Sequence, residues 1–291
     1  MSRKKLPYWL KKRIPNMKAI RGMEKILRDH NLHTVCESAL CPNLGECFQR
    51  KTATFMILGD ICTRNCRFCA VKKGRPLPLD KNEPKNIAKV VRLLKLLHVV
   101  ITSVTRDDLE DSGADQFADC IKEIRKLEPA PSIEVLIPDF GGNFKNLNIV
   151  LAYFPDVLNH NVETVKRLYS KIVPGADYNR SLRILKKAKE YSKNIIVKSG
   201  FMVGLGEKWE EIISLLKDLS DVKCDIVTIG QYLQPSDKHI PIDKFYTPDE
   251  FINLKQIGLE MGIKYIESGP FVRSSYKAKD AFKYVRNLVV S

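Results

Sequence analysis

Short apolar runs alternate with longer amphipathic segments along most of this chain. Apolar residues recur at helical spacing before and between these runs, which predicts helices at 17–30, 84–97, 114–127, 181–191, 207–219 and 248–261. The runs themselves are often β-branched, which predicts strands at 54–58, 99–104, 133–137, 157–160, 195–203, 226–232 and 264–266. Strands that alternate with helices in this way form parallel sheets covered by helices.

Six or seven such strand–helix units fit one α/β fold, an incomplete (β/α)6-type TIM barrel. We expect the barrel at 53–267, with an N-terminal extension at 1–52 and a C-terminal extension at 268–291. Ligands of such folds bind at the C-terminal ends of the strands. Polar residues follow the expected strands, which predicts a polar-lined pocket from 101–108, 159–164, 198–200, 204–206 and 231–235.

The Gly204-Leu-Gly206 sequence within this set lacks the third glycine of a dinucleotide-binding loop. It therefore predicts a turn that lets the backbone approach a ligand closely.

Composition restricts the partners more than the fold. No apolar run reaches the roughly 18 residues that span a bilayer, which predicts a cytoplasmic protein without a membrane partner. The net charge of +15 favours acidic partners, either nucleic acid or an acidic protein, unless it reflects a generally basic proteome. The sequence shows no helix-turn-helix or RNP motif, so we expect no nucleic acid.

The N-terminal residues 1–21 hold eight Lys and Arg and no acidic residue. A transit peptide has this composition, but Pro7 and Pro15 interrupt any long amphipathic helix. Trp9 and Leu10 are typical packing residues. We expect an arm that clamps onto the domain or meets a partner.

Six of the eight cysteines fall between residues 36 and 69. Disulfides need an oxidising compartment, and closed zinc sites take four ligands, often from paired C-x2-C units. Three thiolates suit a four-iron four-sulfur cluster with one iron open, so this is the favoured interpretation, with zinc and disulfides as alternatives. Pro42, Asn43 and Gly45 predict a loop around the first triplet. The triplets are Cys36, Cys41 and Cys47 (C-x4-C-x5-C) and Cys62, Cys66 and Cys69 (C-x3-C-x2-C).

The other two cysteines fit the core. Cys120 lies on the apolar stripe of an expected helix, and Cys224 precedes an expected strand. The five histidines show no helical pair that predicts zinc.

The C-x3-C-x2-C triplet, with Phe68 before its last cysteine, resembles the signature of radical S-adenosylmethionine enzymes. Nearly the whole chain resembles the lipoyl synthase family. The sequences that carry this resemblance are VCESALCPN at 35–43, CTRNCRFCA at 62–70, PGADY at 174–178, KSGFMVGLG at 198–206 and RSSY at 273–276.

This resemblance implies two [4Fe-4S] clusters and S-adenosylmethionine as cofactors. Cys62, Cys66 and Cys69 would hold the cluster that cleaves S-adenosylmethionine. Cys36, Cys41 and Cys47 would hold an auxiliary cluster with a serine as fourth ligand, Ser275 or, failing that, Ser274. Similarity to a His-Asn-x-Asp-Thr sequence of biotin synthase implies that Asn161 and Glu163 bind the ribose. Arg180 would pair with the carboxylate, and Thr102 and Ser103 would line the same face.

The implied activity is that of a sulfurtransferase that inserts two sulfur atoms at C6 and C8 of an octanoyl group on a lysine of a lipoyl carrier domain, with sulfur from the auxiliary cluster. The implied partners are octanoylated glycine cleavage H protein and 2-oxoacid dehydrogenase E2 subunits, an electron donor such as ferredoxin or flavodoxin, and an iron–sulfur carrier for cluster repair. The alternatives are another sulfur-inserting radical enzyme, such as a methylthiotransferase, and a non-enzymatic iron–sulfur carrier.

Three short stretches depart from the family pattern. The chain has Asp111-Ser-Gly-Ala114 for Asp-Gly-Gly-Ala, Phe140-Gly-Gly-Asn143 for Phe-Arg-Gly-Asp, and Val173 for an arginine. No role of the replaced residues can be carried over.

Overall fold

Strands and helices alternate along the chain much as the apolar pattern predicts. The computed structural model describes residues 5–12, 17–50 and 52–290. The chain divides into two compact units. One lies within Ile14–Arg64 and Ala70–Val157, and the other within Met1–Arg13, Asn65–Cys69 and Leu158–Ser291.

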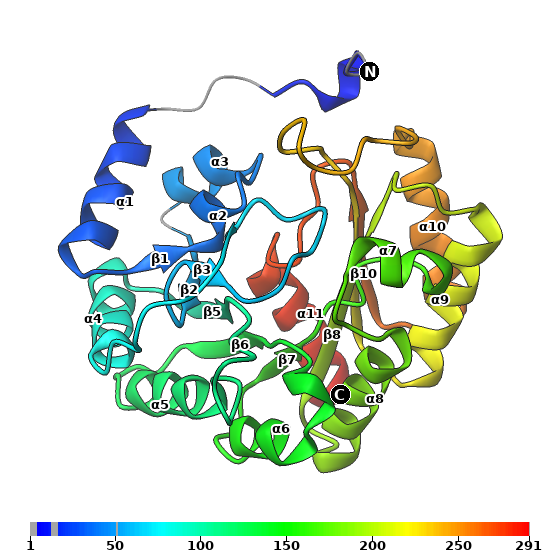
Figure 1. Ribbon diagram of the computed structural model, residues 1–291. Helices are drawn as coiled ribbons and strands as arrows, with labels where there is room; N and C mark the ends of the chain where they lie inside the picture. The colour runs from blue at the N-terminus through cyan, green and yellow to red at the C-terminus, as the bar shows by residue number, and fades with distance from the viewer. Residues whose placement is uncertain (1–4, 13–16, 51, 291) are drawn as a thin grey trace. The chain divides into compact units, whose positions relative to one another are not determined.

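The unit that contains Ile14–Arg64 is built on parallel strands. Strand β2 pairs with β5, and β5 with β6, while the short β1 runs antiparallel to β2. Helices α4 and α5 pack side by side beside these strands (Figure 1). Its elements are α1 (Met17–Asp29), β1 (His33–Thr34), α2 (Val35–Ser38), α3 (Leu44–Gln49), β2 (Thr54–Ile57), β3 (Ile61–Cys62), β4 (Lys72–Lys73), α4 (Glu83–Leu94), β5 (His98–Ser103), α5 (Ala114–Arg125), β6 (Ser132–Leu136), η2 (Phe140–Gly142) and α6 (Phe144–Leu151), and β7 (Val157–Asn159) begins at its end.

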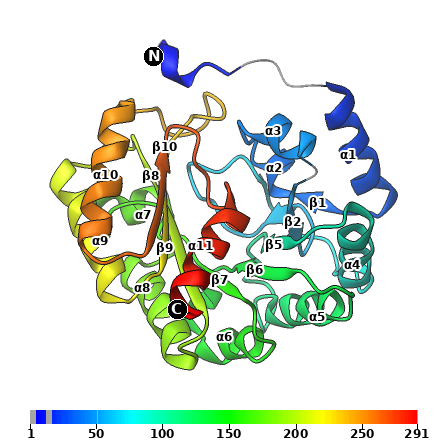
Figure 2. The same cartoon turned by 180° about the vertical axis from the view of Figure 1, so that it is seen from behind.

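The second unit is also built on parallel strands. Strand β9 lies between β8 and β10 and is parallel to both. Figure 2 shows α9 and α10 side by side, and α10 also packs on β10. Its elements are η1 (Tyr8–Leu10), η3 (Lys166–Leu168), α7 (Tyr169–Ile172), α8 (Tyr178–Tyr191), β8 (Ile196–Val203), α9 (Trp209–Asp221), β9 (Ile226–Gln231), α10 (Pro248–Glu260), β10 (Tyr265–Gly269) and α11 (Ala278–Val290).

A glycine allows α10 to approach β10 closely. A Cβ atom at Gly258 would come within 2.3 Å of Ile266 Cδ1, so only glycine fits there without displacing that side chain. Thr247 caps the helix by accepting a hydrogen bond from Glu250 N, and Pro248 begins it.

All seven expected strands are present, with ends within a few residues of the prediction, and the α/β class is confirmed. Helix α4 ends earlier than expected. Lys95 adopts a left-handed conformation with φ of 53° and stops the helix at Leu94, so Leu97 lies outside it and is exposed.

The expected N-terminal arm is described only in part, because residues 1–4 and 13–16, which include Pro15, lie outside the described residues. In the described part, Trp9 Nε1 donates a hydrogen bond to Tyr246 O at 3.2 Å, and Leu10 is buried. Lys12 Nζ lies 4.6 Å from the centre of the Phe271 ring. The arm therefore clamps onto its own unit. In the described part of the chain, no helix has the length and apolar character needed to cross a membrane.

Candidate functional site

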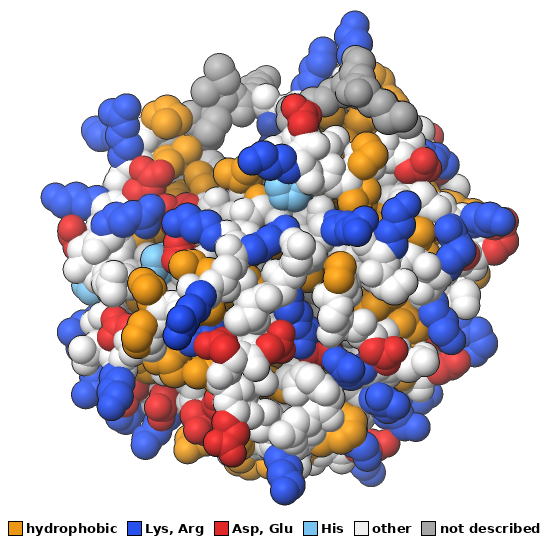
Figure 3. Space-filling view, viewed as in Figure 1, with side chains coloured by type: hydrophobic (Ala, Val, Ile, Leu, Met, Phe, Trp, Pro, Cys, Tyr) orange, Lys and Arg blue, Asp and Glu red, His pale blue; other side chains and the backbone are white. Residues whose placement is uncertain are grey.

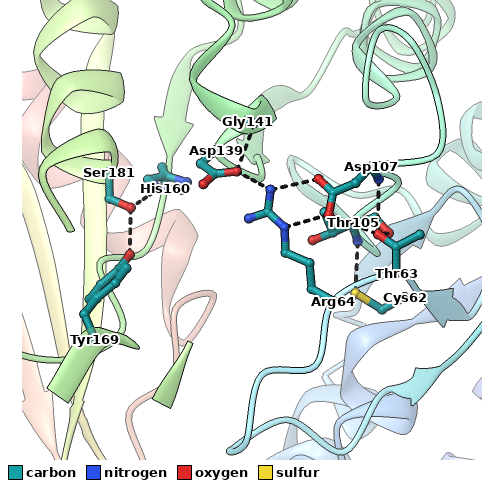
Figure 4. Close-up of polar contacts among 10 residues, drawn as sticks. All are labelled: Cys62, Thr63, Arg64, Thr105, Asp107, Asp139, Gly141, His160, Tyr169 and Ser181. Carbon is teal, nitrogen blue, oxygen red and sulfur yellow. Dashed lines mark hydrogen bonds and ion pairs between the residues drawn. The ribbon is translucent and has the colours of Figure 1, made fainter. Parts of the chain in front are cut away.

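The sulfur of Cys62 is held at the end of a short strand. Strands β3 and β4 pair in parallel, which sets Cys62 opposite Lys73. Gly74 N donates a hydrogen bond to Cys62 O at 3.1 Å. Thr105 N donates to Cys62 Sγ at 3.3 Å (Figure 4). The backbone after β5 thus fixes the sulfur itself.

The segment with Cys66 and Cys69 belongs to the unit that contains Leu158–Ser291. Arg67 N donates a hydrogen bond to Ile172 O at 2.9 Å, and Arg67 O accepts one from Ile240 N at 3.3 Å. His239 Nε2 lies 3.1 Å from Cys69 O and its Nδ1 lies 2.8 Å from Ser236 Oγ. Because a carbonyl only accepts, Nε2 is the donor in its contact with Cys69 O.

Sequence reasoning missed this role of His239. The residue is 170 positions from Cys69, and nothing in its local sequence connects the two.

The first triplet lies mainly on two short helices, and the expectation of a loop there is wrong for two of its three cysteines. Thr34 caps α2 by accepting a hydrogen bond from Glu37 N, which places Cys36 on that helix. Cys47 lies on α3, and Cys41 lies between the helices, with its N–H donating to Cys36 O at 3.0 Å.

The three thiols of this triplet lie in one electrostatic neighbourhood. Burial first, and then the neighbouring Cys41 and Cys47 thiols, raise the pKa of Cys36 to about 12. A buried thiol of this kind becomes a thiolate when a metal centre supplies positive charge. All three are free cysteines, so the donor set fits an iron–sulfur cluster. Among the described residues, no three His, Cys, Asp or Glu side chains gather as a site for a single metal ion. Cys120 and Cys224 are buried in the core, as expected.

Glu163 adopts an unusual backbone conformation beside Asn161. Its φ is 67°, in the left-handed region that L-residues avoid at a cost of about 1–2 kcal/mol. Two backbone hydrogen bonds to β8 hold it there, from Glu163 N to Gly200 O at 3.0 Å and from Met202 N to Glu163 O at 2.9 Å. Strain of this kind is common at functional sites.

Glu163 is half-buried as a residue, and burial of its carboxyl group raises the pKa of that group to about 7, against the lowering effect of a hydrogen bond with Asn161. At neutral pH this carboxylate is therefore close to its midpoint of ionisation.

The two serines of the C-terminal RSSY sequence differ in their contacts. Ser274 Oγ accepts a hydrogen bond from Asn159 Nδ2 and donates one to Asn161 Oδ1, each at 2.9 Å. The half-buried Ser275 hydroxyl makes no hydrogen bond with any described residue. Ser275 is thus the serine whose oxygen remains available to a ligand.

Thr102 and Ser103 at the end of β5 also differ. Thr102 Oγ1 donates to Leu136 O at 3.0 Å, which ties it to the neighbouring strand. Ser103 Oγ is buried and has no hydrogen-bond partner among the described residues. Arg180 is half-buried in the first turn of α8, where its N–H donates to the capping Asp177 carboxylate at 2.7 Å.

A buried hydrogen-bonded chain supports the segment that contains Asn161. Ser181 Oγ lies 2.9 Å from His160 Nε2 and 2.7 Å from Tyr169 OH (Figure 4). These hydrogen bonds fix the His160 side chain, and with it the backbone on either side. Nothing in the local sequence around His160 predicts these hydrogen bonds, because the residues that make them come from α7 and α8.

Two of the polar stretches expected to line a pocket are structural. The amides of Gly204 and Leu205 donate to the Glu207 carboxylate at 2.6 and 2.9 Å. A Cβ atom at Gly204 would lie 2.2 Å from Gln231 Nε2 and 2.6 Å from Lys244 O. The close approach predicted for this turn is therefore to the protein itself, and Gln231 is saturated by backbone partners.

Figure 3 shows lysine and arginine side chains spread over the visible face and interspersed with acidic ones. The excess of positive charge is thus distributed over this face and does not form one patch on it.

Two family models match this chain. The model described as the radical SAM superfamily matches residues 56–219, and that of the N-terminal domain of lipoyl synthase matches residues 1–41. The first match covers more than half of the chain and includes the C-x3-C-x2-C triplet.

Curated lipoyl synthases match almost end to end. The protein of Caldanaerobacter subterraneus subsp. tengcongensis is 57% identical over 272 residues, which cover 94% of this chain and 95% of the relative. The lipoyl synthase of Pseudomonas fluorescens strain SBW25 is 52% identical over 288 residues, which cover 99% of this chain and 84% of the relative.

Solved structures match at the level of the fold. The FeFe-hydrogenase maturase HydG from Carboxydothermus hydrogenoformans aligns with a TM-score of 0.56 at 14% identity, over 92% of this chain and 78% of that one. Methylornithine synthase (PylB) aligns with a TM-score of 0.53 at 15% identity, over 86% of this chain and 84% of that one. These matches support the expected fold class, and with the sequence matches they show that the chain belongs to the lipoyl synthase family of the radical SAM superfamily.

Proposed function

We propose that this chain inserts two sulfur atoms, at C6 and C8, into an octanoyl group linked to a lysine of a lipoyl carrier domain. The observation that carries this proposal is the match to curated lipoyl synthases over nearly the full length of both chains. The match of residues 1–41 to the lipoyl synthase N-terminal model favours this activity over that of a methylthiotransferase. The chain is thus an enzyme of the sulfurtransferase class, with iron–sulfur clusters and S-adenosylmethionine as cofactors.

We assign the cluster that binds S-adenosylmethionine to Cys62, Cys66 and Cys69, and the auxiliary cluster to the first triplet with Ser275. When bound, the first cluster and S-adenosylmethionine supply a radical that removes hydrogen atoms, and the auxiliary cluster supplies sulfur. In this assignment 53–267 carries the radical chemistry, and 1–52 with 268–291 serve the auxiliary cluster.

Asn161 and Glu163 are assigned to the ribose of S-adenosylmethionine. The ionised carboxylate of Glu163 accepts hydrogen bonds from two hydroxyls, and its strained backbone is fixed by β8 before the ligand arrives. Ser103, whose buried hydroxyl has no partner among the described residues, is assigned to the same ligand with Thr102, and Arg180 to its carboxylate.

Ser275 is preferred over Ser274 as the fourth auxiliary ligand because the Ser274 hydroxyl already donates and accepts. A serine oxygen is a harder ligand than a thiolate and suits iron–sulfur chemistry less well. It should therefore leave readily when the cluster gives up its sulfur.

The partners that this reaction requires are an octanoylated carrier, a one-electron donor such as ferredoxin or flavodoxin, and an iron–sulfur carrier that rebuilds the auxiliary cluster. The net charge of +15 suits acidic proteins. Among the carriers, we propose glycine cleavage H protein and 2-oxoacid dehydrogenase E2 subunits. The eight free cysteines support a reducing compartment, and we propose the cytoplasm.

The test uses the full chain, reconstituted without oxygen, with S-adenosylmethionine, a reductant and an octanoyl-lysyl peptide. Mass spectrometry should show a peptide that has gained two sulfurs and lost two hydrogens. Cys41→Ala should abolish this product and leave cleavage of S-adenosylmethionine intact. Cys120→Ala, which removes a core cysteine, is the matched control and should still form product. An unchanged peptide in a protein shown to hold both clusters would refute the proposal.

A further inference from the structure

Arg64 lies between two cysteines of the C-x3-C-x2-C triplet, and its guanidinium is held by two carboxylates. Its Nε and Nη2 donate to the two oxygens of Asp107 at 2.9 and 2.8 Å (Figure 4). Nη2 also lies 2.6 Å from Asp139 Oδ1. The pair with Asp107 is bidentate, the geometry that gives arginine its directional strength.

These three residues join three separate loops. Arg64 follows β3, Asp107 follows β5 and Asp139 follows β6. Each loop lies at the carboxyl end of its strand, where a barrel places its reactive groups. The guanidinium therefore links the cluster-binding loop to two of its neighbours.

The contact is largely removed from water. The side chains of Arg64 and Asp139 are 11% and 1% exposed, while that of Asp107 is 41% exposed. Burial opposes the charge of Arg64, but the two carboxylates outweigh it and raise the pKa of the guanidinium. Loss of Arg64 would remove the positive charge from beside the buried Asp139 carboxylate.

The turn that presents Asp139 is strained. The buried Phe140 has a φ of 46°, which is rare for a bulky residue. Asp139 Oδ1 accepts a hydrogen bond from Gly141 N at 3.1 Å, and Asp139 O accepts one from Gly142 N at 2.8 Å. The carboxylate that faces Arg64 is therefore aimed by its own turn, at an energetic cost to the backbone.

A continuous set of hydrogen bonds connects this contact to the Cys62 sulfur. Thr63 N and Thr63 Oγ1 both donate to Thr105 O at 3.0 Å. Asp107 N donates to Thr63 Oγ1 at 3.1 Å. Thr105 N then donates to Cys62 Sγ at 3.3 Å. Displacement of Asp107 would thus disturb the residue that binds the sulfur.

We propose that Arg64 is a positioning residue for the cluster that cleaves S-adenosylmethionine, fixed by Asp107 and Asp139 so that Thr105 N–H is held on the Cys62 sulfur. The proposal rests on the assignment of Cys62 to that cluster. It predicts that Arg64 affects both how firmly the protein retains the cluster and the reduction potential of the cluster. Hydrogen bonds to cluster sulfurs stabilise the more negative reduced state and therefore raise the reduction potential.

Asp139 could act through its negative charge or by fixing Arg64, and the two explanations predict opposite shifts in the reduction potential of Asp139→Asn. Removal of a negative charge near the cluster, by itself, would raise the reduction potential. If Asp139 acts by fixing Arg64, the loosened loop weakens the N–H···S bond and the potential falls. The sign of the shift therefore separates the two explanations.

The experiment uses the full chain with Cys36, Cys41 and Cys47 changed to alanine, so that only one cluster remains. In this background we would compare Arg64→Met, Asp139→Asn and a control, Arg125→Met, which removes an arginine–aspartate pair of the same unit, with Asp156 at 2.8 Å. The readouts are iron loss to a chelator and the potential from an EPR-monitored redox titration. If the background does not fold, the EPR signal that responds to S-adenosylmethionine in the two-cluster protein replaces it.

Arg64→Met and Asp139→Asn should each weaken iron retention about tenfold, as loss of groups that orient metal ligands does. Both should lower the potential, by about 59 mV for a tenfold change in the one-electron equilibrium. Arg125→Met should change neither. A raised potential in Asp139→Asn, or values in Arg64→Met equal to the control, would overturn the inference. If Cys62→Ala keeps its cluster, the cluster assignment fails instead.

Discussion

The Ser274 hydroxyl donates a hydrogen bond to Asn161 Oδ1 at 2.9 Å, and this contact joins the C-terminal RSSY sequence to the segment assigned to S-adenosylmethionine. The two residues are 113 positions apart in the chain. The same hydroxyl accepts from Asn159 Nδ2, so it fixes the orientation of both amides. Ser275, the next residue, is the proposed ligand of the auxiliary cluster.

Alanine substitutions at the two serines should have different effects. Ser274→Ala leaves Asn161 without its donor and should raise the KM for S-adenosylmethionine several-fold, since a neutral hydrogen bond contributes about 1 kcal/mol. Ser275→Ala should leave that KM unchanged and abolish formation of the sulfur-containing product. Separate assays of S-adenosylmethionine cleavage and product formation measure both effects. If the two variants exchange phenotypes, Ser274 is the ligand.

Ionisation of Glu163 should make binding of S-adenosylmethionine depend on pH near neutrality. Burial raises the pKa of this carboxyl to about 7, and only the ionised form accepts hydrogen bonds from both ribose hydroxyls. Affinity should therefore rise between about pH 6 and 8 and then level off. Calorimetric titration without oxygen measures it.

Glu163→Gln should bind more weakly than the unmodified chain at pH 8 and lose the dependence on pH. An affinity that falls as pH rises through 7 would contradict this role.

The raised pKa of Glu163 affects folding stability in the opposite direction from ligand binding. Because the folded-state pKa lies above the ordinary value of 4.5, this group makes the fold less stable as pH rises from about 4.5 to 7.

The strands and most long helices could be predicted because their cause is local. Buried β-branched runs such as Ile226–Gln231 have the period and length of strands, whatever lies around them. The spacing of the cysteines likewise predicted iron–sulfur clusters from the local sequence. The supports of the site could not be predicted, because they depend on contacts between distant segments. For example, the sequence around Arg64 does not show that it pairs with Asp107 and Asp139, because only the fold brings these residues together.

Ser112 offers a simple test of a departure from the family pattern. The chain has serine where the pattern has glycine, and Ser112 adopts a φ of 54°. A left-handed conformation costs a residue with a side chain about 1–2 kcal/mol more than glycine. Ser112→Gly should therefore raise the free energy of unfolding by about 1 kcal/mol. Part of this gain is offset, because glycine has more conformational entropy to lose from the unfolded chain.

Thermal and urea unfolding measure this change. Ser112→Ala keeps the Cβ atom and should give no gain. A loss of stability in Ser112→Gly would show that the serine has a role in the folded state that its backbone conformation does not reveal.

Gly230 on β9 should control the position of the RSSY sequence. A Cβ atom there would lie 2.1 Å from Val272 O, and a backbone carbonyl cannot yield as a flexible side chain can. Gly230→Ala should displace the segment that carries Ser275 and cost about 1–3 kcal/mol, the range for overpacking. Product formation should fall far more than S-adenosylmethionine cleavage, as in Ser275→Ala. Gly269→Ala is the matched control, because its Cβ atom would meet Val272 Cγ2 at an ordinary 3.5 Å. Equal losses of cleavage and product in Gly230→Ala would show that β9 supports the whole site and not the C-terminal segment in particular.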